Sequence, residues 1–452
     1  MTHALQISRR QALSALTLAC CGCAASRSAP VQVSGDPVEQ AVQRAHDEIW
    51  KRFIDPRFFT FYDYAGLDGT VILPTPEECA VSKPNALAWW TPIENGAFFG
   101  GLYLDALCNR WRARRDKLTA ERAHRIAQGL VRLAVVGSTP GFIARGVAAN
   151  GTSHYPAGSD DQTFPWFYGL WRYLNSGVVT KKARERGTET VRLMIRVAQA
   201  LMGYRWRMPC DDGRLGFRGS FASFDYIHAT RLLFLVKAMH NLTGHPQWLD
   251  RYQTYLHEKS PESGKTRLEI CAEGALYESP GPNYKPGHPA NPEFWTSASC
   301  QAGLRALAEM EADPAVRERF RQGLERNAVK AAEHVSRYRE YDNESAEVFD
   351  VDWRFLNEKW RPQRTIDEAV KLAQIQVRDW NARSPKRRLE SLHLREPLFA
   401  AWVVALSGNS ELVAKQRGEI QAALTHYQWN RLHTSLFFIA ENVHYEMQRY
   451  QA

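Results

Sequence analysis

Acidic, imidazole and phenol groups gather directly before an aromatic run in the segment HYPAGSDDQTFPWFYGLWRYLNSG, which spans 154–177. It supplies His154, Tyr155, Asp160 and Asp161 within eight positions. Cleavage of a glycosidic bond requires an acid, a base or hydrogen-bond partner, and an aromatic floor for the sugar. We therefore treat these four residues as candidate catalytic groups.

Proline divides this segment, because a helix tolerates proline in its first turn but not deeper inside. Pro165 therefore predicts a helix that begins near Thr163, with both acids in the preceding loop. Gln162, Trp166 and the upstream Arg145 become candidate substrate-binding residues. Acids at a helix N-terminus also have a purely structural explanation, since they complement the helix dipole and cap free N–H groups.

A second cluster lies in NALAWWTPIENGAFFGGLYLDAL, where Trp89 and Trp90 precede an expected helix over 92–112. We propose Glu94 as a further catalytic acid at the N-terminus of this helix, with the two tryptophans and Asn95 as substrate-binding residues. Thr91 and Glu94 also have the spacing of a capping box, which would make Glu94 a structural residue.

Weaker candidates lie near other expected helix starts. Arg218 and His228 occur in FRGSFASFDYIHATRLL, and Tyr284 and Trp295 in YESPGPNYKPGHPANPEFWTSAS. LHLREP adds Arg395. A lone histidine is more often a structural group than a catalyst, but the repetition of aromatic-polar clusters favours a lined cleft.

The elements that would position these residues are helices, because apolar residues recur every three or four positions from about 36 onward. Strand signals are limited to short pieces such as GTVILP and GFIARGV. We predict one all-α domain over 36–452, an (α/α)6 toroid of antiparallel helical hairpins with long functional loops; stacked helix pairs are the alternative. The expected helices span 36–53, 92–112, 118–136, 163–176, 181–204, 222–242, 246–258, 292–312, 314–340, 366–382, 388–406, 410–425 and 428–449.

The charge balance indicates an anionic partner. The 452-residue chain carries a formal net charge of +9 and a pI of about 9.1, which suits an acidic glycan, a nucleic acid or a membrane surface. Its basic residues, Arg387 and Arg388 among them, are scattered through expected helices rather than gathered in a tract. We interpret them as solvated helix faces and expect no nucleic-acid partner.

The N-terminal residues 1–30 resemble a bacterial twin-arginine export signal. Arg9 and Arg10 precede a short apolar stretch and a small-residue region, and the stretch is too short for a transmembrane helix. Cys20 and its neighbours offer possible sites for a lipid anchor. We expect an exported protein, in the periplasm or attached to the outer membrane.

The five cysteines after the N-terminal region do not have the spacing of metal ligands; they are Cys79, Cys108, Cys210, Cys271 and Cys300. They are widely spaced, with no CxxC pair or Cys/His cluster, so we expect no metal site. The sequence also lacks a P-loop, a GxSxG elbow and an HExxH motif. We expect no cofactor.

With the helix count, WWTPIENGAFFGGLYLDAL and SHYPAGSDDQTFPWFYGLWRY in view, the chain resembles the six-hairpin glycosidase superfamily, nearest to the bacterial glucuronyl and unsaturated-uronyl hydrolases. The resemblance implies that Glu94 and Asp161, or Asp160 instead, act on a terminal uronic sugar without a metal. It also implies that arginines such as Arg145 or Arg218 bind the uronate carboxylate. The relatives carry aspartate at both catalytic places, so Glu94 departs from their pattern.

Two other functions stay open. A polysaccharide lyase would use Tyr155 and His154 to abstract the C5 proton of a uronic acid and to protonate the leaving oxygen. A non-catalytic glycan-binding protein would need the aromatic residues but not the acids. The hydrolase is favoured over the lyase because no all-β half follows the helices.

Overall fold

Helices make up most of the chain in the computed structural model, which describes residues 35–179, 184–211, 213–275 and 294–450. The expected all-α class is confirmed for these residues, where the strands β1 (Arg207–Pro209) and β2 (Phe217–Ser220) form one small antiparallel pair. The expected strand signals in GTVILP and GFIARGV are wrong, since both segments are loops. The expected export signal over 1–30 and the candidate Tyr284 lie outside the described residues.

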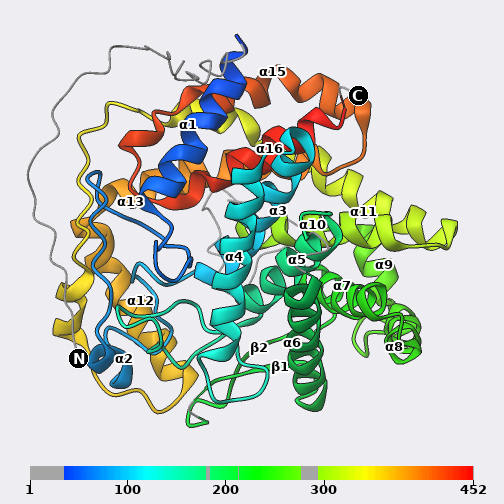
Figure 1. The fold of residues 1–452 in the computed structure, drawn as a ribbon, viewed down its shortest axis with the longest axis horizontal. Helices are drawn as coiled ribbons and strands as arrows, with labels where there is room; N and C mark the ends of the chain where they lie inside the picture. The colour runs from blue at the N-terminus through cyan, green and yellow to red at the C-terminus, as the bar shows by residue number, and fades with distance from the viewer. Residues whose placement is uncertain (1–34, 180–183, 212, 276–293, 451–452) are drawn as a thin grey trace, which may run out of the picture. The chain divides into compact units, whose positions relative to one another are not determined.

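Sixteen α-helices occur in the described ranges (Figure 1). They are α1 (Pro37–Arg52), α2 (Pro76–Ala80), α3 (Gly96–Arg114), α4 (Lys117–Val135), α5 (Asp160–Asn175), α6 (Arg184–Gly203), α7 (Tyr226–Thr243), α8 (Pro246–His257), α9 (Arg267–Glu273), α10 (Phe294–Met310), α11 (Pro314–Ala332), α12 (Ile366–Arg383), α13 (Pro385–Glu390), α14 (Glu396–Ala405), α15 (Ser410–His426) and α16 (Ile439–Gln448). Short 3-10 helices add η2 (Val335–Glu340), η3 (Trp353–Lys359), η5 (Trp429–Arg431) and η6 (Ser435–Phe438), and η4 (Ser391–Arg395) is a π-helix.

Three expected helices are interrupted. The helix expected over 314–340 ends at Ala332 as α11 and is followed by the 3-10 helix η2. The helix expected over 388–406 is divided into α13, the π-helix η4 and α14. The helix expected over 428–449 begins with η5 and η6 and becomes α-helical only at Ile439. Periodicity does not detect such changes, because 3-10, α and π turns present similar apolar spacing over a few residues.

The N-terminus of α5 differs from the sequence expectation. The helix begins at Asp160 rather than near Thr163, so both acids lie in its first turn and Pro165 lies inside the helix. The proline ring removes only one intrahelical N–H, whose partner would be the carbonyl of Asp161. The Thr163 N–H and hydroxyl both donate to the Ser159 carbonyl, at 3.0 and 2.8 Å, and these bonds stabilise the first turn.

Glycines allow α3 and α5 to approach each other until their backbones touch. A Cβ atom on Gly101 would lie 2.1 Å from the Pro165 carbonyl oxygen, and one on Gly169 would lie 2.3 Å from the Gly101 carbonyl oxygen. Real Cβ atoms do not approach oxygen so closely, so glycine is required at both positions. The N-termini of α3 and α5 are thereby held next to each other.

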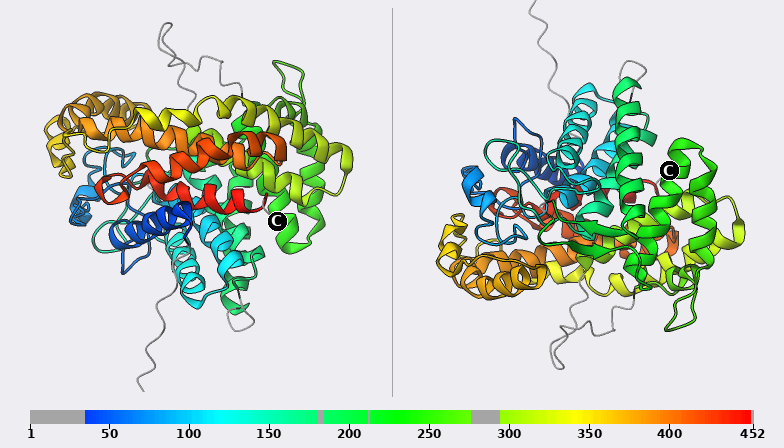
Figure 2. Two further views of the ribbon diagram at one scale, coloured as in Figure 1. Left: turned by 90° about the horizontal axis from the view of Figure 1, so that it is seen from above. Right: turned by 90° about the horizontal axis from the view of Figure 1, so that it is seen from below.

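The other core helices extend this packing. Helix α5 contacts α7, α7 contacts α10, α10 contacts α14, and α14 contacts α16. Helix α16 contacts α3. Helices α4, α6, α11, α15 and α1 pack against these core helices, and the residues from Asp36 onward form one contact unit. In both views of Figure 2, α12 and α13 lie at the side opposite α7 and α8.

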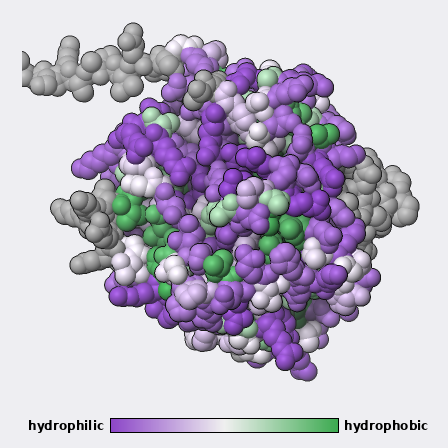
Figure 3. Space-filling model, turned by 90° about the vertical axis from the view of Figure 1, so that its right-hand side faces the viewer, coloured by the Kyte–Doolittle hydropathy of each residue, from purple (hydrophilic) through white to green (hydrophobic). Residues whose placement is uncertain are grey.

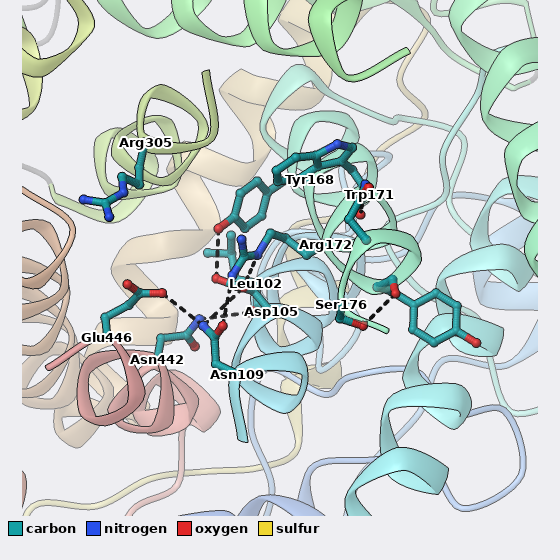
Figure 4. A network of polar contacts seen from close by, with 12 residues as sticks. Leu102, Asp105, Asn109, Tyr168, Trp171, Arg172, Ser176, Arg305, Asn442 and Glu446 are labelled. Atoms are coloured by element: carbon teal, nitrogen blue, oxygen red, sulfur yellow. Dashed lines mark hydrogen bonds and ion pairs between the residues drawn. The ribbon is translucent and has the colours of Figure 1, made fainter. Parts of the chain in front are cut away.

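A buried polar network joins α3, α5 and α16 away from the two helix N-termini (Figure 4). The Arg172 guanidinium donates to Asp105 at 2.5 Å and to Asn109 at 2.9 Å, and the Tyr168 hydroxyl donates to Asp105 at 2.8 Å. Asn109 in turn donates to Glu446 at 3.1 Å. Since each buried charge has a partner, the network fixes the register of the three helices without an unpaired ion.

The surface turned to the viewer in Figure 3 is mainly hydrophilic, with hydrophobic residues in small separate groups. No helix in the described ranges is both long and apolar enough to cross a membrane.

The contact between α3 and α5 generates a stability prediction. We expect Gly101→Ala to lower the free energy of unfolding by about 3 kcal/mol, because overpacking forces the two backbones apart. Gly203→Ala is the control, since a Cβ atom at that helical position has no neighbour within 4 Å. Urea unfolding followed by circular dichroism measures both variants. Equal stability of the two would contradict the role assigned to the contact.

Candidate active site

The N-termini of α3 and α5 open into a cavity of about 460 Å³. It combines acids, arginines and tryptophans from segments that are far apart in the sequence. The lining residues are Asp63, Tyr64, Trp89, Trp90, Glu94, Asn95, Phe99, Arg145, Asp161, Trp295, Val377, Asn381, Arg387, Arg388, Ser391, Leu392, Arg395, Thr434 and Leu436.

Arg145 connects the two helix N-termini. Its guanidinium donates to the Glu94 carbonyl at 2.9 Å and to the Ser159 hydroxyl at 2.8 Å. It also lies 3.6 Å from the Asp161 carboxylate, which accepts a hydrogen bond from Ser159. Since the Arg145 side chain is buried, its donors are used to orient the site, and Asp161 points into the cavity from a fixed position.

The Glu94 side chain does not form the expected capping box with Thr91. Its carboxylate accepts a hydrogen bond from the Trp90 N–H at 2.7 Å, whereas the Thr91 hydroxyl donates to the Ala88 carbonyl at 2.7 Å. Helix α3 begins two residues later, at Gly96, without a side-chain cap. Because Thr91 is occupied elsewhere, Glu94 is free to face the cavity.

The backbone of Trp90 adopts a left-handed conformation, with φ of 73°. Such a conformation in a bulky residue costs about 1–3 kcal/mol and requires support. Three hydrogen bonds provide it: the Trp90 N–H donates to Glu94, the Trp90 indole donates to the Ala373 carbonyl at 2.9 Å, and the Tyr64 hydroxyl donates to the Trp90 carbonyl at 2.8 Å. The indole is therefore held rigidly in the cavity wall.

Asp63 is a third acid in the cavity. Its two carboxylate oxygens accept hydrogen bonds from the Asn95 N–H at 2.8 Å and from the Asn95 side-chain amide at 2.6 Å. The Gln162 side-chain amide donates to the side-chain oxygen of Asn95 at 2.9 Å and accepts from the Phe98 N–H at 2.9 Å. Asn95 and Gln162 thus hold Asp63 and both helix starts in one network.

The environment of Asp63 favours its protonated form. Burial raises the pKa of the Asp63 carboxyl well above its usual range, and the charge of Glu94 raises it further, although the Asn95 hydrogen bonds oppose this shift. Two neighbouring carboxyl groups with limited access to water do not both ionise readily. Asp63 is therefore the acid of the cavity that is driven toward its protonated form.

Arginines and tryptophans form another part of the cavity wall. The Arg387 guanidinium lies 4.8 Å from the centre of the Trp90 ring, and that of Arg395 lies 4.9 Å from the centre of the Trp295 ring. Arg395 is paired with Glu396, at 2.6 Å. The two arginine–tryptophan contacts have the geometry of cation–π interactions. The π-helix η4 follows α13 and carries Arg395, and such local helix irregularities are frequent at functional sites.

The structure separates Asp160 from the cavity. Its carboxylate pairs with Arg231 and lies 3.3 Å from a ring nitrogen of His228, whose other nitrogen lies 2.5 Å from Asp225. Burial opposes the charged form of Asp160, but Arg231 and His228 hold the pKa of this carboxyl well below its usual range. Asp160 and His228 therefore form an ion-pair cluster beside α7 rather than a part of the cavity.

The other candidates from 154–166 also lie elsewhere. The Tyr155 hydroxyl is buried and donates to the Lys83 carbonyl, and the Trp166 indole, fully buried, donates to the Leu130 carbonyl at 2.8 Å. Both ring nitrogens of His154 are engaged, one with the Thr152 carbonyl and the other with Asp211, each at 2.9 Å. The loop before α5 holds Tyr155 and His154 outside the cavity that Asp161 faces, and Trp166 lies in the buried part of α5.

The cavity therefore contains eight of the expected residues: Trp89, Trp90, Glu94, Asn95, Arg145, Asp161, Trp295 and Arg395. Gln162 supports them from the core, and Arg218 lies 5.2 Å from the centre of the Trp89 ring without lining the cavity.

Asp63 lines the cavity but was not among the expected residues. The expectation of a solvated helix face is wrong for Arg387, which is half-buried in the cavity wall, whereas Arg388 lines the cavity and is exposed as expected. Asp63 lies in FYDYAG, a polar residue between aromatic residues in a long loop. Pro385 begins the short helix that carries both arginines, and a proline next to a basic pair was a signal that the segment leaves the regular helical pattern.

No cluster of three or more His, Cys, Asp and Glu side chains in the described ranges is arranged to hold a metal ion. The five cysteines between Cys79 and Cys300 are buried and form no disulfide bond within the described ranges.

A scan against protein-family models gives no match. A search of curated proteins likewise finds no significantly similar sequence.

The cluster around Asp160 generates a pH prediction. Burial would lower the pKa of His228, but hydrogen bonds to Asp160 and Asp225 raise it to about 9, above the unfolded value of about 6.5. The resulting stability is present below pH 6.5 and is lost as the pH rises through 9. We expect wild-type protein to lose about 1–3 kcal/mol more than His228→Gln between pH 6.5 and 10. Urea unfolding across this range measures the difference. Parallel curves for the two proteins would contradict the pairing.

Proposed function

We propose that this protein is an exported glycoside hydrolase that removes a terminal uronic acid from an acidic oligosaccharide or polysaccharide. The observation that carries the proposal is the single cavity in which Glu94, Asp63 and Asp161 meet tryptophans and arginines. Tryptophan rings bind sugar rings, carboxyl groups catalyse glycosidic cleavage, and arginines bind an acidic substrate. The resemblance to the six-hairpin glucuronyl hydrolases supports the same assignment.

We also propose that the core helices form an (α/α)6 toroid. The contacts run from α3 through α5, α7, α10, α14 and α16 and return to α3, and further helices pack against these six. An active site at the N-termini of α3 and α5 then lies at one end of the toroid, where the long loops 53–95 and 136–159 also lie against the cavity.

In the proposed reaction, the pair formed by Asp63 and Glu94 supplies a proton to the glycosidic oxygen as the bond from this oxygen to the sugar breaks. Asp161 accepts a proton from the water molecule whose oxygen forms the new bond to the sugar. The environments of the acids differ as this division requires: Asp63 is driven toward its protonated form, whereas Asp161 lies beside the Arg145 guanidinium. For an unsaturated uronide, the same proton would go to the vinyl ether, and water would add to the adjacent carbon.

This assignment predicts a loss of turnover in three variants. We expect Asp161→Asn, Glu94→Gln and Asp63→Asn each to lower kcat/KM by about 10²–10⁴-fold, the usual contribution of general acid–base catalysis. Substrates are saturated and lyase-generated unsaturated uronic oligosaccharides, followed by reducing ends and by the ultraviolet absorbance of the conjugated double bond. The control is Asp367→Asn, which changes an exposed aspartate in the first turn of α12, outside the cavity.

Loss of absorbance together with new reducing ends would identify an unsaturated-uronyl hydrolase, and reducing ends without an absorbance change would identify a glucuronidase. A rise in absorbance would indicate a lyase and overturn the proposal. Full activity in Asp161→Asn would remove this residue from the mechanism and leave it as a helix-terminal charge.

A further inference from the structure

Among the cavity's arginines, Arg387 differs from Arg145 and Arg395 in having donors without a partner, and from Arg388 in being half-buried rather than exposed. No hydrogen bond or ion pair joins its guanidinium to another side chain in the described ranges. Arg145, in contrast, donates to Glu94 and Ser159, and Arg395 is paired with Glu396. A guanidinium carries five N–H donors. Those of Arg387 stay accessible from the cavity, since the fully buried nitrogen atoms without a partner in the described ranges include none of Arg387.

Arg387 is nevertheless held in place. It belongs to α13, whose N-terminal Ser384 hydroxyl is bonded to the Asp350 backbone at 2.9 and 3.2 Å. Its guanidinium lies over the indole of Trp90, which three hydrogen bonds fix. Stacking on a rigid ring restricts the guanidinium plane while its N–H edges stay available, an arrangement suited to bidentate recognition of a carboxylate.

From these contacts we infer that Arg387 binds the carboxylate of the substrate's terminal uronic acid, stacked on Trp90, and that it sets the preference for acidic over neutral sugars. This inference rests on the proposed function for the choice of a sugar as ligand. It replaces Arg145 and Arg218 in that role, because the two terminal nitrogens of Arg145 already donate to Glu94 and Ser159 and Arg218 does not line the cavity.

The electrostatics of Arg387 agree with this role. Burial lowers the pKa of its guanidinium from the usual value, whereas Glu94 and Asp63 favour the charged form. A bound substrate carboxylate would place a further negative charge beside the Arg387 guanidinium, whose charge Glu94 and Asp63 compensate only partly. It would also lie close to the two acids that we propose as the proton source, so binding of the carboxylate orients the sugar toward them.

The test measures binding separately from turnover. D-glucuronate, D-galacturonate and D-mannuronate are each titrated calorimetrically against the matching neutral hexose, with wild-type protein, Arg387→Gln and Arg387→Lys. We expect wild-type protein to prefer at least one uronate and Arg387→Gln to weaken its binding about 10–100-fold, with the neutral hexose changed less than about twofold. Arg387→Lys keeps the charge but loses the planar fork, so its affinity should be intermediate.

Arg383→Gln is the matched control. It removes an arginine of similar charge four positions earlier, whose guanidinium lies 4.4 Å from the centre of the Phe355 ring and does not line the cavity. Its uronate affinity should equal that of wild-type protein, and the circular dichroism spectra of all variants should coincide.

Three results would overturn the inference: equal weakening of uronate and hexose in Arg387→Gln, unchanged uronate binding in this variant, or no preference for uronate in wild-type protein. Cleavage of neutral glycosides without any preference for uronates would leave the hydrolase standing and remove the role of Arg387. Uronate binding that depends on Arg387 without cleavage of any glycoside would support the inference and contradict only the proposed hydrolysis.

Discussion

The contact between the backbones of α3 and α5 is the constraint on which the site depends. Gly101 and Gly169 permit it, and Pro165 supplies one of the touching carbonyl groups. Because side chains of any size would separate the helices, this contact fixes how close their N-termini lie. The distance across which Arg145 connects Glu94 to Asp161 is therefore set by residues in the middle of the helices, remote from any chemistry.

Opposite charges share one small cavity, and their arrangement determines what it can bind. The three acids come from the α3 and α5 mouths and the loop before them, whereas the arginines without partners come from α13. Full pairing of these groups with one another would neutralise the site and leave no role for a ligand. In the proposed reaction, the separation would keep the acids available for proton transfer and Arg387 available for an anion.

The parts of the site that the sequence could predict are those with local signals. Helix periodicity and the acids before an aromatic run identified the two helix N-termini near which Glu94 and Asp161 lie. Asp63 and Arg387 have no comparable pattern, because the chain brings them to the cavity only through tertiary packing. The closeness of Tyr155 and His154 to Asp161 in the sequence wrongly suggested a shared site. The Tyr155 hydroxyl bonds to the Lys83 carbonyl and His154 contacts Asp211, so neither side chain reaches the cavity that contains Asp161.

The left-handed turn at Trp90 links the fold to the proposed chemistry. Its supporting hydrogen bonds come from Glu94, Tyr64 and Ala373, which belong to the α3 mouth, the loop of Asp63 and helix α12. A backbone conformation that costs energy persists only where its surroundings determine it from several sides. Glu94 thus has two roles: it stabilises the ring on which Arg387 stacks, and it raises the pKa of Asp63. Recognition of the acidic sugar and retention of the catalytic proton would then depend on the same carboxylate.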